Sequence, residues 1–321
     1  MILTLTLNPL LEKRYFVENI KSGKTLRSRK DYYSAGGKGV NVSRQLNLLG
    51  MNNLALIPIG GNTGKIYRHV IEAEGINFSA MSVKSEMRMG SVIIGDDSKV
   101  TTVIGENIPL LKSDITKINE KLGKMIENAS AVVVAGSVPD EKSAEIICRV
   151  IERGNELDKI TLLDTYGTHL KECLSAAPFV VHNNIAEIKN SLNLTLTTED
   201  EIISYLKFLY KSGVKIAAVT DGKNPAYFLK FGFLYKVIPP KIKEVDSTGS
   251  GDSLVAGMIY GLEKDLVFNN IMAKSVALGA ANASQLSTSS VNAEQMNELA
   301  KKVKITEIGE KMKVIDDSPN Y

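Results

Sequence analysis

Short apolar runs alternate with segments of helical periodicity along most of this chain. We expect strands at Ile2–Leu7, Leu54–Ile59, Ala131–Ala135, Ile160–Leu163, Phe179–Val181 and Ile216–Thr220. We expect helices at Val40–Leu49, Tyr67–Glu74, Asp114–Glu127, Ser143–Arg153, Glu199–Lys211, Ser253–Glu263, Asn269–Ser284 and Ala293–Val303. Because strands that alternate with helices are joined by crossover connections, this order predicts a mostly parallel sheet with helices on both faces. Ligands of such sheets bind at the carboxyl ends of the strands.

Two segments, about 12–34 and 77–106, break this alternation. In the second, Met89–Gly95 and Val100–Ile104 have strand character with no helix between them. We therefore expect the two inserts to form a small sheet attached to a single domain that spans residues 1–321. Such a sheet can act as a lid that excludes water from an active site. A surface extension without a catalytic role is the alternative.

Composition excludes several classes of protein. With 321 residues, 44% of them hydrophobic, the chain can bury a large core. Its 39 Lys and Arg nearly balance its 36 Asp and Glu, so no nucleic-acid partner is expected. Cys148 and Cys173 belong to no paired motif, which favours reduced thiols and a cytoplasmic location. No membrane span is expected either, because no apolar stretch is long enough.

The segment Val245–Ser253 has the layout of a phosphoryl-transfer site. It places two glycines and an aspartate before a helix, since apolar residues from Leu254 to Leu262 recur at helical spacing. Backbone N–H groups at a helix N-terminus bind anions, and glycines let a phosphate come close. Asp252 would lie beside that anion, where it can take a proton from an attacking hydroxyl. An ordinary turn capped by Asp252 or Ser253 is the alternative.

A second glycine turn, Gly36–Gly39, precedes the helix expected at Val40–Leu49 and can bind an anion or a hydroxyl-rich group. It lacks the dinucleotide fingerprint, and Gly60–Lys65 is one residue short of a P-loop, so NAD enzymes and P-loop ATPases are not expected. Arg88, in the second insert, can clamp a phosphate with its planar guanidinium. A structural turn and a solvated charge are the alternatives.

Two further polar residues, Asn184 and Glu187, follow the strand expected at Phe179–Val181. Their spacing allows them to orient Mg²⁺ through its water molecules. It equally allows Asn184 to cap a helix with Glu187 in its first turn. The three histidines, at positions 69, 169 and 182, share no metal-ligand spacing, so ordinary core or surface roles are expected for them.

Taken in order, these segments resemble the ribokinase-like carbohydrate kinases, and among them the phosphofructokinase-B branch that holds 1-phosphofructokinase and tagatose-6-phosphate kinase. The resemblance covers nearly the whole chain and rests on Thr4–Pro9, Gly36–Arg44, Ile59–Gly64, Gly136–Pro139, Leu163–Thr165, Asn184–Glu187 and Asp246–Ser253. It implies a ribokinase-like three-layer α/β/α sandwich with a mostly parallel sheet and a small β-sheet lid. It also implies a homodimer that pairs through the lid.

The resemblance implies roles for individual residues. Asp252 would be the general base, with the anion hole formed by Gly249, Ser250 and Gly251. The phosphosugar would be held by Glu12, Gly37, Lys38, Asn41, Arg44, Arg88 and Ser137. ATP would be bound by His182, Asn184, Thr220, Gly222 and Asn282. Mg²⁺ would be held, largely through water, by Glu187 and Asn184. We further expect Lys38, Arg44 and Arg88 to converge on the phosphate of an already phosphorylated sugar.

The chain departs from the family pattern at four places. Glu12 stands where Asp is usual, and His182 stands where Lys is usual. Val219–Pro225 lacks the usual second glycine, and Val103–Pro109 lacks the acidic and Asn residues at their usual positions. The longer Glu12 side chain moves a carboxylate that ordinarily binds sugar hydroxyls, and His182 replaces a fixed cation by a titratable group.

The function expected from the resemblance is Mg²⁺-dependent phosphorylation of a hexose phosphate by ATP. Tagatose 6-phosphate and fructose 1-phosphate are the leading acceptors, ahead of fructose 6-phosphate. One alternative is a kinase of an unphosphorylated sugar or nucleoside. Another is a sugar-phosphate-binding regulatory protein descended from a kinase.

Overall fold

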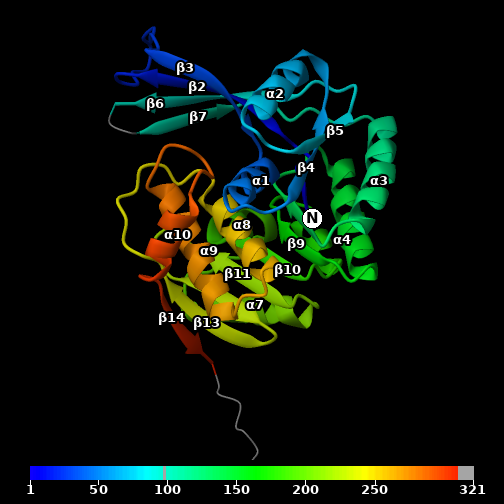
Figure 1. Ribbon diagram of the computed structural model, residues 1–321, viewed down its shortest axis with the longest axis vertical. Coiled ribbons are helices and arrows are strands. Elements are labelled where there is room, and N and C mark those ends of the chain that lie inside the picture. The colour runs from blue at the N-terminus through cyan, green and yellow to red at the C-terminus, as the bar shows by residue number, and fades with distance from the viewer. Residues whose placement is uncertain (97–98, 310–321) are drawn as a thin grey trace, which may run out of the picture.

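The computed structural model describes residues 1–96 and 99–309. Its main feature is a ten-stranded sheet with the strand order β14-β13-β12-β11-β10-β9-β8-β1-β4-β5 (Figure 1). The strands from β5 to β11 pair in parallel, and β12, β13 and β14 continue the sheet in antiparallel fashion. The bounds are β1 (Ile2–Leu5), β4 (Asn53–Ile59), β5 (Phe78–Ser82), β8 (Ala131–Ala135), β9 (Ile160–Asp164), β10 (Val180–Asn184), β11 (Ile216–Thr220), β12 (Ala226–Lys230), β13 (Phe233–Ile238) and β14 (Lys304–Ile308).

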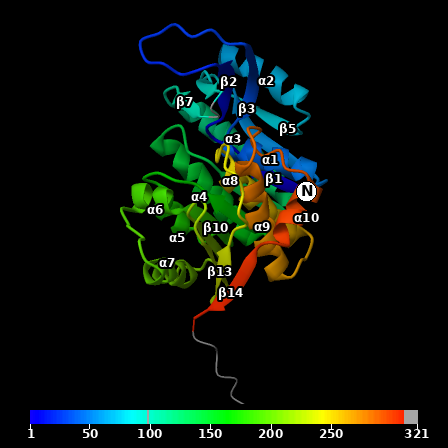
Figure 2. The ribbon, with the colours of Figure 1, turned by 90° about the vertical axis from the view of Figure 1, so that its left-hand side faces the viewer.

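Helices cover both faces of this sheet (Figures 1 and 2). One face carries α3 (Lys112–Glu127), α4 (Ala144–Glu156), α5 (Leu170–Ser175), α6 (Ile185–Leu192) and α7 (Glu199–Lys211). The other face carries α1 (Lys38–Leu48), α2 (Gly61–Ala73), α8 (Ser250–Glu263), α9 (Phe268–Ala283) and α10 (Ala293–Ala300). In β8, Val132 and Val134 pack toward the first group, and Ala131 and Val133 toward the second. Strands buried on both faces read as continuous apolar runs, which is why the sequence predicts them well.

A four-stranded sheet, which we call the lid, lies at one end of the molecule (Figure 1). Its order is β3 (Lys30–Gly36), β2 (Leu10–Val17), β6 (Arg88–Gly95) and β7 (Val100–Ile104). The chain enters the lid after the carboxyl end of β1 and leaves β3 directly into α1. The predicted sandwich with a mostly parallel sheet and a small second sheet is therefore confirmed.

Two expected boundaries were wrong. The second insert was expected from residue 77, but β5 pairs in parallel with β4 and belongs to the large sheet, so the lid part begins at Arg88. As an edge strand with polar residues, β5 lacks the apolar run that marks the others. Helix α2 begins at Gly61 instead of Tyr67. Its glycine-rich first turn is held by the Glu86 carboxylate, which accepts hydrogen bonds from the N–H groups of Asn62 and Thr63.

Some short elements were not predicted, namely α5, β12 and β14. Each has six residues or fewer, too few to show a clear period. No helix within residues 1–96 and 99–309 is long and apolar enough to cross a bilayer.

The packing of α8 on α9 gives a test of the core. A Cβ added at Gly257 of α8 would lie 2.7 Å from Ser275 Cα of α9, so the two helices would have to separate. We expect Gly257→Ala to lower the free energy of unfolding by about 1–3 kcal/mol, the usual cost of overpacking. Gly123→Ala in α3, where no atom lies within 4 Å, should raise it by about 0.5–1 kcal/mol. Urea unfolding measures both. Equal gains in the two variants would show that the helix contact is not tight.

Candidate active site

The two glycine turns meet where the parallel strands end. Helix α1 begins at Lys38, after the lid, and helix α8 begins at Ser250. The first turns of these helices touch, because Asn41 Nδ2 donates a 2.7 Å hydrogen bond to Asp252 Oδ2. Asp164, the last residue of β9, lies beside them and binds Lys38. The sequence thus brings residues about 200 positions apart to one edge of the sheet, as the alternation of strands and helices predicts.

Asp252 lies in the first turn of α8 and is 4% exposed. Burial of its carboxylate raises the pKa to about 6; the charge of Lys38 and the hydrogen bond from Asn41 oppose this rise, and the charge of Asp164 adds to it. Oδ2 is engaged by Asn41, and the structure places no protein donor on Oδ1 within the described residues. The carboxylate therefore combines one fixed oxygen with one that is open to a reactant, at a pKa suited to proton transfer near neutral pH.

Lys38 forms a partly buried ion-pair cluster at the start of α1. Its Nζ lies 3.1 Å from Asp164 Oδ1 and 2.7 Å from Glu187 Oε1. Burial of the ammonium disfavours its charged form, but the carboxylates of Asp164, Glu187 and Asp252 outweigh this effect and raise the pKa of Lys38. The same competition holds at Asp164. Burial favours the neutral acid, but Lys38 and His182 outweigh this effect and hold the pKa of Asp164 at about 2. Lys38 is therefore a permanent cation next to Asp252.

A chain of hydrogen bonds fixes the Asn41 amide. Arg44 Nη1 donates to Asn41 Oδ1 at 2.6 Å, so the Nδ2 group of Asn41 is the one that faces Asp252. The Arg44 guanidinium also binds the Glu74 carboxylate at 2.6 Å and the Ala35 carbonyl. Arg44 therefore orients the partner of Asp252, and its expected role in holding the phosphosugar stays a prediction.

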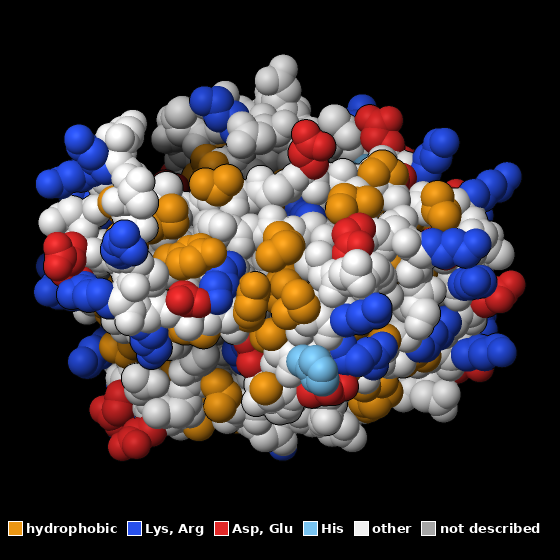
Figure 3. All heavy atoms as spheres, turned by 90° about the horizontal axis from the view of Figure 1, so that it is seen from above, with side chains coloured by type: hydrophobic (Ala, Val, Ile, Leu, Met, Phe, Trp, Pro, Cys, Tyr) orange, Lys and Arg blue, Asp and Glu red, His pale blue; other side chains and the backbone are white. Residues whose placement is uncertain are grey.

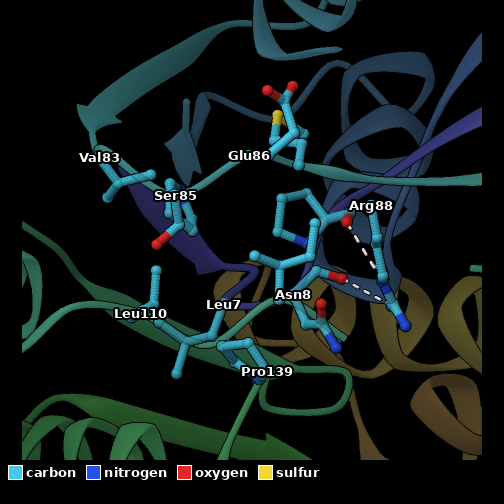
Figure 4. A pocket seen from close by; sticks show the side chains of 12 residues that line it. Leu7, Asn8, Val83, Ser85, Glu86, Arg88, Leu110 and Pro139 are labelled. Atoms are coloured by element: carbon cyan, nitrogen blue, oxygen red, sulfur yellow. Dashed lines mark hydrogen bonds between the residues drawn. The ribbon is translucent and has the colours of Figure 1, made fainter. Parts of the chain in front are cut away.

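Arg88, the first residue of β6, lies in a different cluster (Figure 4). Its guanidinium donates to the carbonyl of Asn8 at 2.8 Å and to Asn107 Oδ1 at 2.9 Å. The Asn8 amide donates in turn to Asn107 Oδ1 and to Ser137 Oγ, at 2.9 and 3.0 Å. Arg88 and Ser137 are thus joined through two asparagines, and Figure 4 shows Arg88 and Asn8 at one end of a small pocket beneath the lid.

The expected convergence of three cations is not seen in this structure. Lys38 binds Asp164 and Glu187, whereas Arg44 binds Glu74. Arg88 binds carbonyl groups and Asn107, and the three share no partner among the described residues. The reason is that each cation already has its own protein acceptors, which residue type alone does not reveal.

The turn before α8 has the geometry expected of an anion hole. Gly249 caps the helix with φ +79°, a conformation that favours glycine, and a Cβ there would collide with Thr288 Cγ2. The first N–H groups of a helix have no partner within it. Of these, the N–H of Ser250 donates to the Ser247 carbonyl, while no bond to the described residues outside the helix is found for Gly251. Gly251 lies close to His182, since a Cβ there would be 3.2 Å from His182 Cε1.

Asn282 supports this turn. It is 1% exposed, and its Nδ2 donates to the Thr248 carbonyl at 2.8 Å and to Ser250 Oγ at 3.1 Å. Its Oδ1 accepts a 2.6 Å bond from the Ser289 N–H. The buried amide thus braces the anion-hole turn, and the expected role of Asn282 in binding ATP stays a prediction.

His182 lies between β9 and β11 and is 1% exposed. Its Nδ1 lies 3.1 Å from Asp164 Oδ1, and its Nε2 lies 3.1 Å from Thr220 Oγ1. Thr220 ends β11, and the exposed turn after it contains Gly222, which has a positive φ of 52° and open space beside it. His182 thus links the Lys38 cluster to the loop that we expected to bind the nucleotide.

Asn184 and Glu187 form a reciprocal capping box at the start of α6. Asn184 Oδ1 accepts from the Glu187 N–H at 2.8 Å, and Glu187 Oε2 accepts from the Asn184 N–H at 3.2 Å. The capping alternative is therefore realised. It does not exclude a role near a metal, because a carboxylate has about four acceptor positions and Glu187 also faces Lys38. No cluster of three His, Cys, Asp or Glu able to hold a metal directly occurs among residues 1–96 and 99–309.

Glu12 lies on the lid strand β2 and packs against the first glycine turn. A Cβ added at Gly36 would lie 2.8 Å from Glu12 Oε1, and Arg14 Nε donates to Glu12 Oε2 at 3.2 Å. Gly37, the N-cap of α1, has φ 125° and lies against Thr6. These glycines let the lid strand come close to α1, which places Glu12 at the active-site edge.

Sequence reasoning missed four residues of this region, which are Asn8, Arg14, Asn107 and Asp164. Asp164 had a signal, since it is an aspartate at the end of a fully apolar strand. The two asparagines lie in loops, where no periodicity singles out a residue. Arg14 stands in a strand whose burial alternates irregularly, so its burial could not be read from the pattern.

The proteins to which this chain is similar in sequence and fold are named as sugar kinases. The profile of the pfkB family carbohydrate kinases matches residues 11–297. Tagatose-6-phosphate kinase from Staphylococcus epidermidis is 29% identical over 313 residues, which cover 96% of this chain and 100% of that protein. 1-Phosphofructokinase from Borreliella burgdorferi is 29% identical over 284 residues, or 88% and 92% of the two chains. The crystal structure of phosphofructokinase-2 from Escherichia coli in complex with fructose-6-phosphate superposes with a TM-score of 0.82, at 24% identity and covering 94% and 98%.

The fold and the matching profile define the class of protein, which is an ATP-dependent sugar kinase. The chain belongs to the pfkB family of carbohydrate kinases. The resemblance inferred from the sequence motifs is thereby confirmed.

The hydrogen bond from Asn41 to Asp252 gives a direct electrostatic test. Because this bond favours the charged carboxylate, Asn41→Leu should raise the pKa of Asp252 above its value of about 6. The pKa can be followed by NMR titration of ¹³C-labelled aspartate carboxyl groups. Asn47→Leu, on the same helix but bonded to the Gly75 carbonyl, should leave the pKa unchanged. A pKa that stays at about 6 or falls in Asn41→Leu would show that the bond does not act on Asp252.

Proposed function

We propose that this protein transfers the γ-phosphoryl group of ATP to a hydroxyl of a hexose phosphate and forms the bisphosphate. The observation that carries the proposal is Asp252, buried at a glycine-lined helix start and flanked by the permanent cation of Lys38. Two relatives, named tagatose-6-phosphate kinase and 1-phosphofructokinase, support a hexose phosphate as the acceptor. Tagatose 6-phosphate and fructose 1-phosphate lead as acceptors, with fructose 6-phosphate third.

In this proposal the open oxygen of Asp252 takes the proton of the attacking hydroxyl. Asn41 holds the other oxygen and so sets the direction of approach. The turn formed by Gly249, Ser250 and Gly251 would receive the transferring group, with the N–H of Gly251 and the helix dipole facing its negative charge. Lys38 lies close enough to Asp252 to neutralise charge as it develops at the same place.

The acceptor would lie under the lid. Arg88 is the cation best placed for the phosphate of the acceptor, because it lies at the lid edge. It binds the carbonyl of Asn8, whose side chain in turn binds Ser137. To bind a phosphate, its guanidinium would exchange carbonyl and amide acceptors for a charged one, which is favourable. Glu12 faces the turn of Gly36 and Gly37 from the lid and would accept hydrogen bonds from sugar hydroxyls.

The nucleotide would lie along the carboxyl ends of β10 and β11. His182 is bonded to Thr220 there, Gly222 lies in the turn that follows Thr220, and Asn184 caps the adjacent helix. Glu187 fits a magnesium ion held mainly by phosphates and water, since it retains acceptor capacity beside Lys38. When bound, Mg²⁺ would neutralise charge on the phosphates of ATP.

The lid is also proposed as a homodimer contact. Several of its side chains are large, apolar and exposed, namely Tyr32, Tyr33, Met89, Val103 and Ile104. Seen from the lid side, apolar side chains lie exposed between basic and acidic ones (Figure 3). Exposed apolar surface of this kind marks interaction sites when it is continuous. The cytoplasmic location stays a prediction from composition.

Acceptor class is tested by the rate of ADP formation with phosphorylated and free sugars. We expect tagatose 6-phosphate or fructose 1-phosphate to exceed tagatose, fructose and ribose by at least about 10²-fold in kcat/KM, equivalent to roughly 2.7 kcal/mol. Arg88→Ala should erase much of this preference by raising KM for the phosphosugar. Arg68→Ala, which removes an arginine of α2 stacked on the Phe78 ring, should leave the preference unchanged. Better activity on the free sugars would contradict the phosphosugar assignment, and no ADP with any acceptor would favour a binding protein.

The role of Glu187 is tested by its magnesium dependence. Glu187→Gln keeps an oxygen for the cap of α6 but loses the charge that would orient the water shell of the ion, so half-maximal rate should need several-fold more Mg²⁺. Glu201→Gln is a matched control, because Glu201 forms the same capping box at the start of α7. Equal magnesium curves for the wild type and Glu187→Gln would restrict Glu187 to capping and ion pairing.

A further inference from the structure

Arg14 is a buried cation that has no role yet in the proposed function, because it belongs to neither glycine turn and to no helix cap. It lies on lid strand β2, and 4% of its side chain is exposed. Its Nε donates to Glu12 Oε2 at 3.2 Å. Its other two nitrogens leave the lid and donate to the Leu286 carbonyl and to Thr288 Oγ1, each at 3.0 Å. One guanidinium therefore joins the lid to the loop between α9 and α10.

That loop forms the back of the anion-hole turn. Thr288 packs so closely on Gly249 that no Cβ would fit there. The next residue, Ser289, donates its N–H to Asn282 and lies within hydrogen-bond distance of Ser253 Oγ, 3.2 Å away. A short path of contacts thus runs from Glu12 through Arg14 and Thr288 to Gly249.

We propose that Arg14 is a positioning residue that ties acceptor recognition on the lid to the anion hole. The inference rests on the proposed function and deepens it. By holding Glu12 at one end and the loop of residues 286–288 at the other, Arg14 sets the distance between the sugar-binding carboxylate and the turn that receives the phosphoryl group. Glu12 has one more side-chain torsion than the Asp that is usual at this position. The bond from Arg14 fixes that torsion, so that the Glu12 carboxylate keeps one position.

Stability alone is a poor explanation of this arrangement. Replacing a buried ion pair by apolar residues of similar size is often neutral or stabilising. A planar guanidinium, however, holds several acceptors in fixed directions, which apolar packing cannot do. Its acceptors lie 272 and 274 residues further along the chain, in the loop that packs on the anion-hole turn. A group that spans the site in this way is suited to setting geometry.

The first test is kinetic and uses the full-length protein. Arg14→Gln should lower kcat/KM for the phosphosugar by at least about tenfold, with kcat and the KM for phosphosugar both affected and the KM for ATP changed by less than about twofold. Arg14→Lys should recover only part of the loss, because it keeps the charge but not the planar fork. Arg29→Gln removes an exposed lid arginine paired with Asp96 and should leave all constants unchanged. A lower melting temperature with unchanged kinetic constants in Arg14→Gln would overturn the proposal.

A double-mutant cycle tests whether Arg14 acts through Glu12. If it does, Glu12→Gln should cost much less in the Arg14→Gln background than in the wild type. Strict additivity of the two losses would contradict the coupling.

Amide hydrogen exchange tests the link without any turnover, so it separates this inference from the proposed function. In Arg14→Gln, protection should fall in residues 10–17 and in residues 284–292 together, whereas Arg29→Gln should leave the second segment as it is. Unchanged exchange in residues 284–292 would show that Arg14 does not hold that loop. If the wild type proved inactive but Arg14→Gln still lost protection in both segments, the proposed function would be wrong and the role of Arg14 in holding the loop would stand.

Discussion

One half-buried ammonium group, that of Lys38, holds the charged edge of the large sheet together. Its partners are Asp164, at the end of β9, and Glu187, in the cap of α6. Without this cation, these carboxylates and Asp252 would lie close together in a buried place, which is costly. The same charge keeps Asp252 more acidic than burial alone would make it. Lys38 therefore serves the fold and the chemistry through one set of contacts.

The lid is connected to this centre by two polar paths. At the end of β3, Ser34 Oγ donates to Glu74, which binds Arg44, and Arg44 orients Asn41 toward Asp252. The second path runs through Arg14 to the loop behind the anion hole. Both paths end at the start of α8, the first at Asp252 and the second at Gly249. A change in the position of the lid would therefore shift both Asp252, the proposed base, and the Gly249–Gly251 turn, which is proposed to hold the phosphoryl group.

The sequence predicts best what depends on local pattern. The buried parallel strands and the start of α8 follow from apolar runs and from glycines before a periodic segment, and the structure has them in these places. Partner choice is different, because it depends on residues far apart. Arg44 was expected at a phosphate and is found on Glu74, and the burial of Arg14 has no local signal. The position of β5 was missed because an edge strand needs no apolar run.

The central claim is that Asp252 acts as the base and that Lys38 keeps it ionised. It is tested most directly by the pH dependence of kcat/KM for the phosphosugar, which reports the pKa of the free enzyme. Since the base must be ionised, the wild-type rate should fall as the pH drops below about 6. In Lys38→Met this fall should move to higher pH, and Asp252→Asn should lose about 10²–10⁴ in kcat. An acid limb that stays in place in Lys38→Met, or an Asp252→Asn variant with near wild-type turnover, would contradict the account.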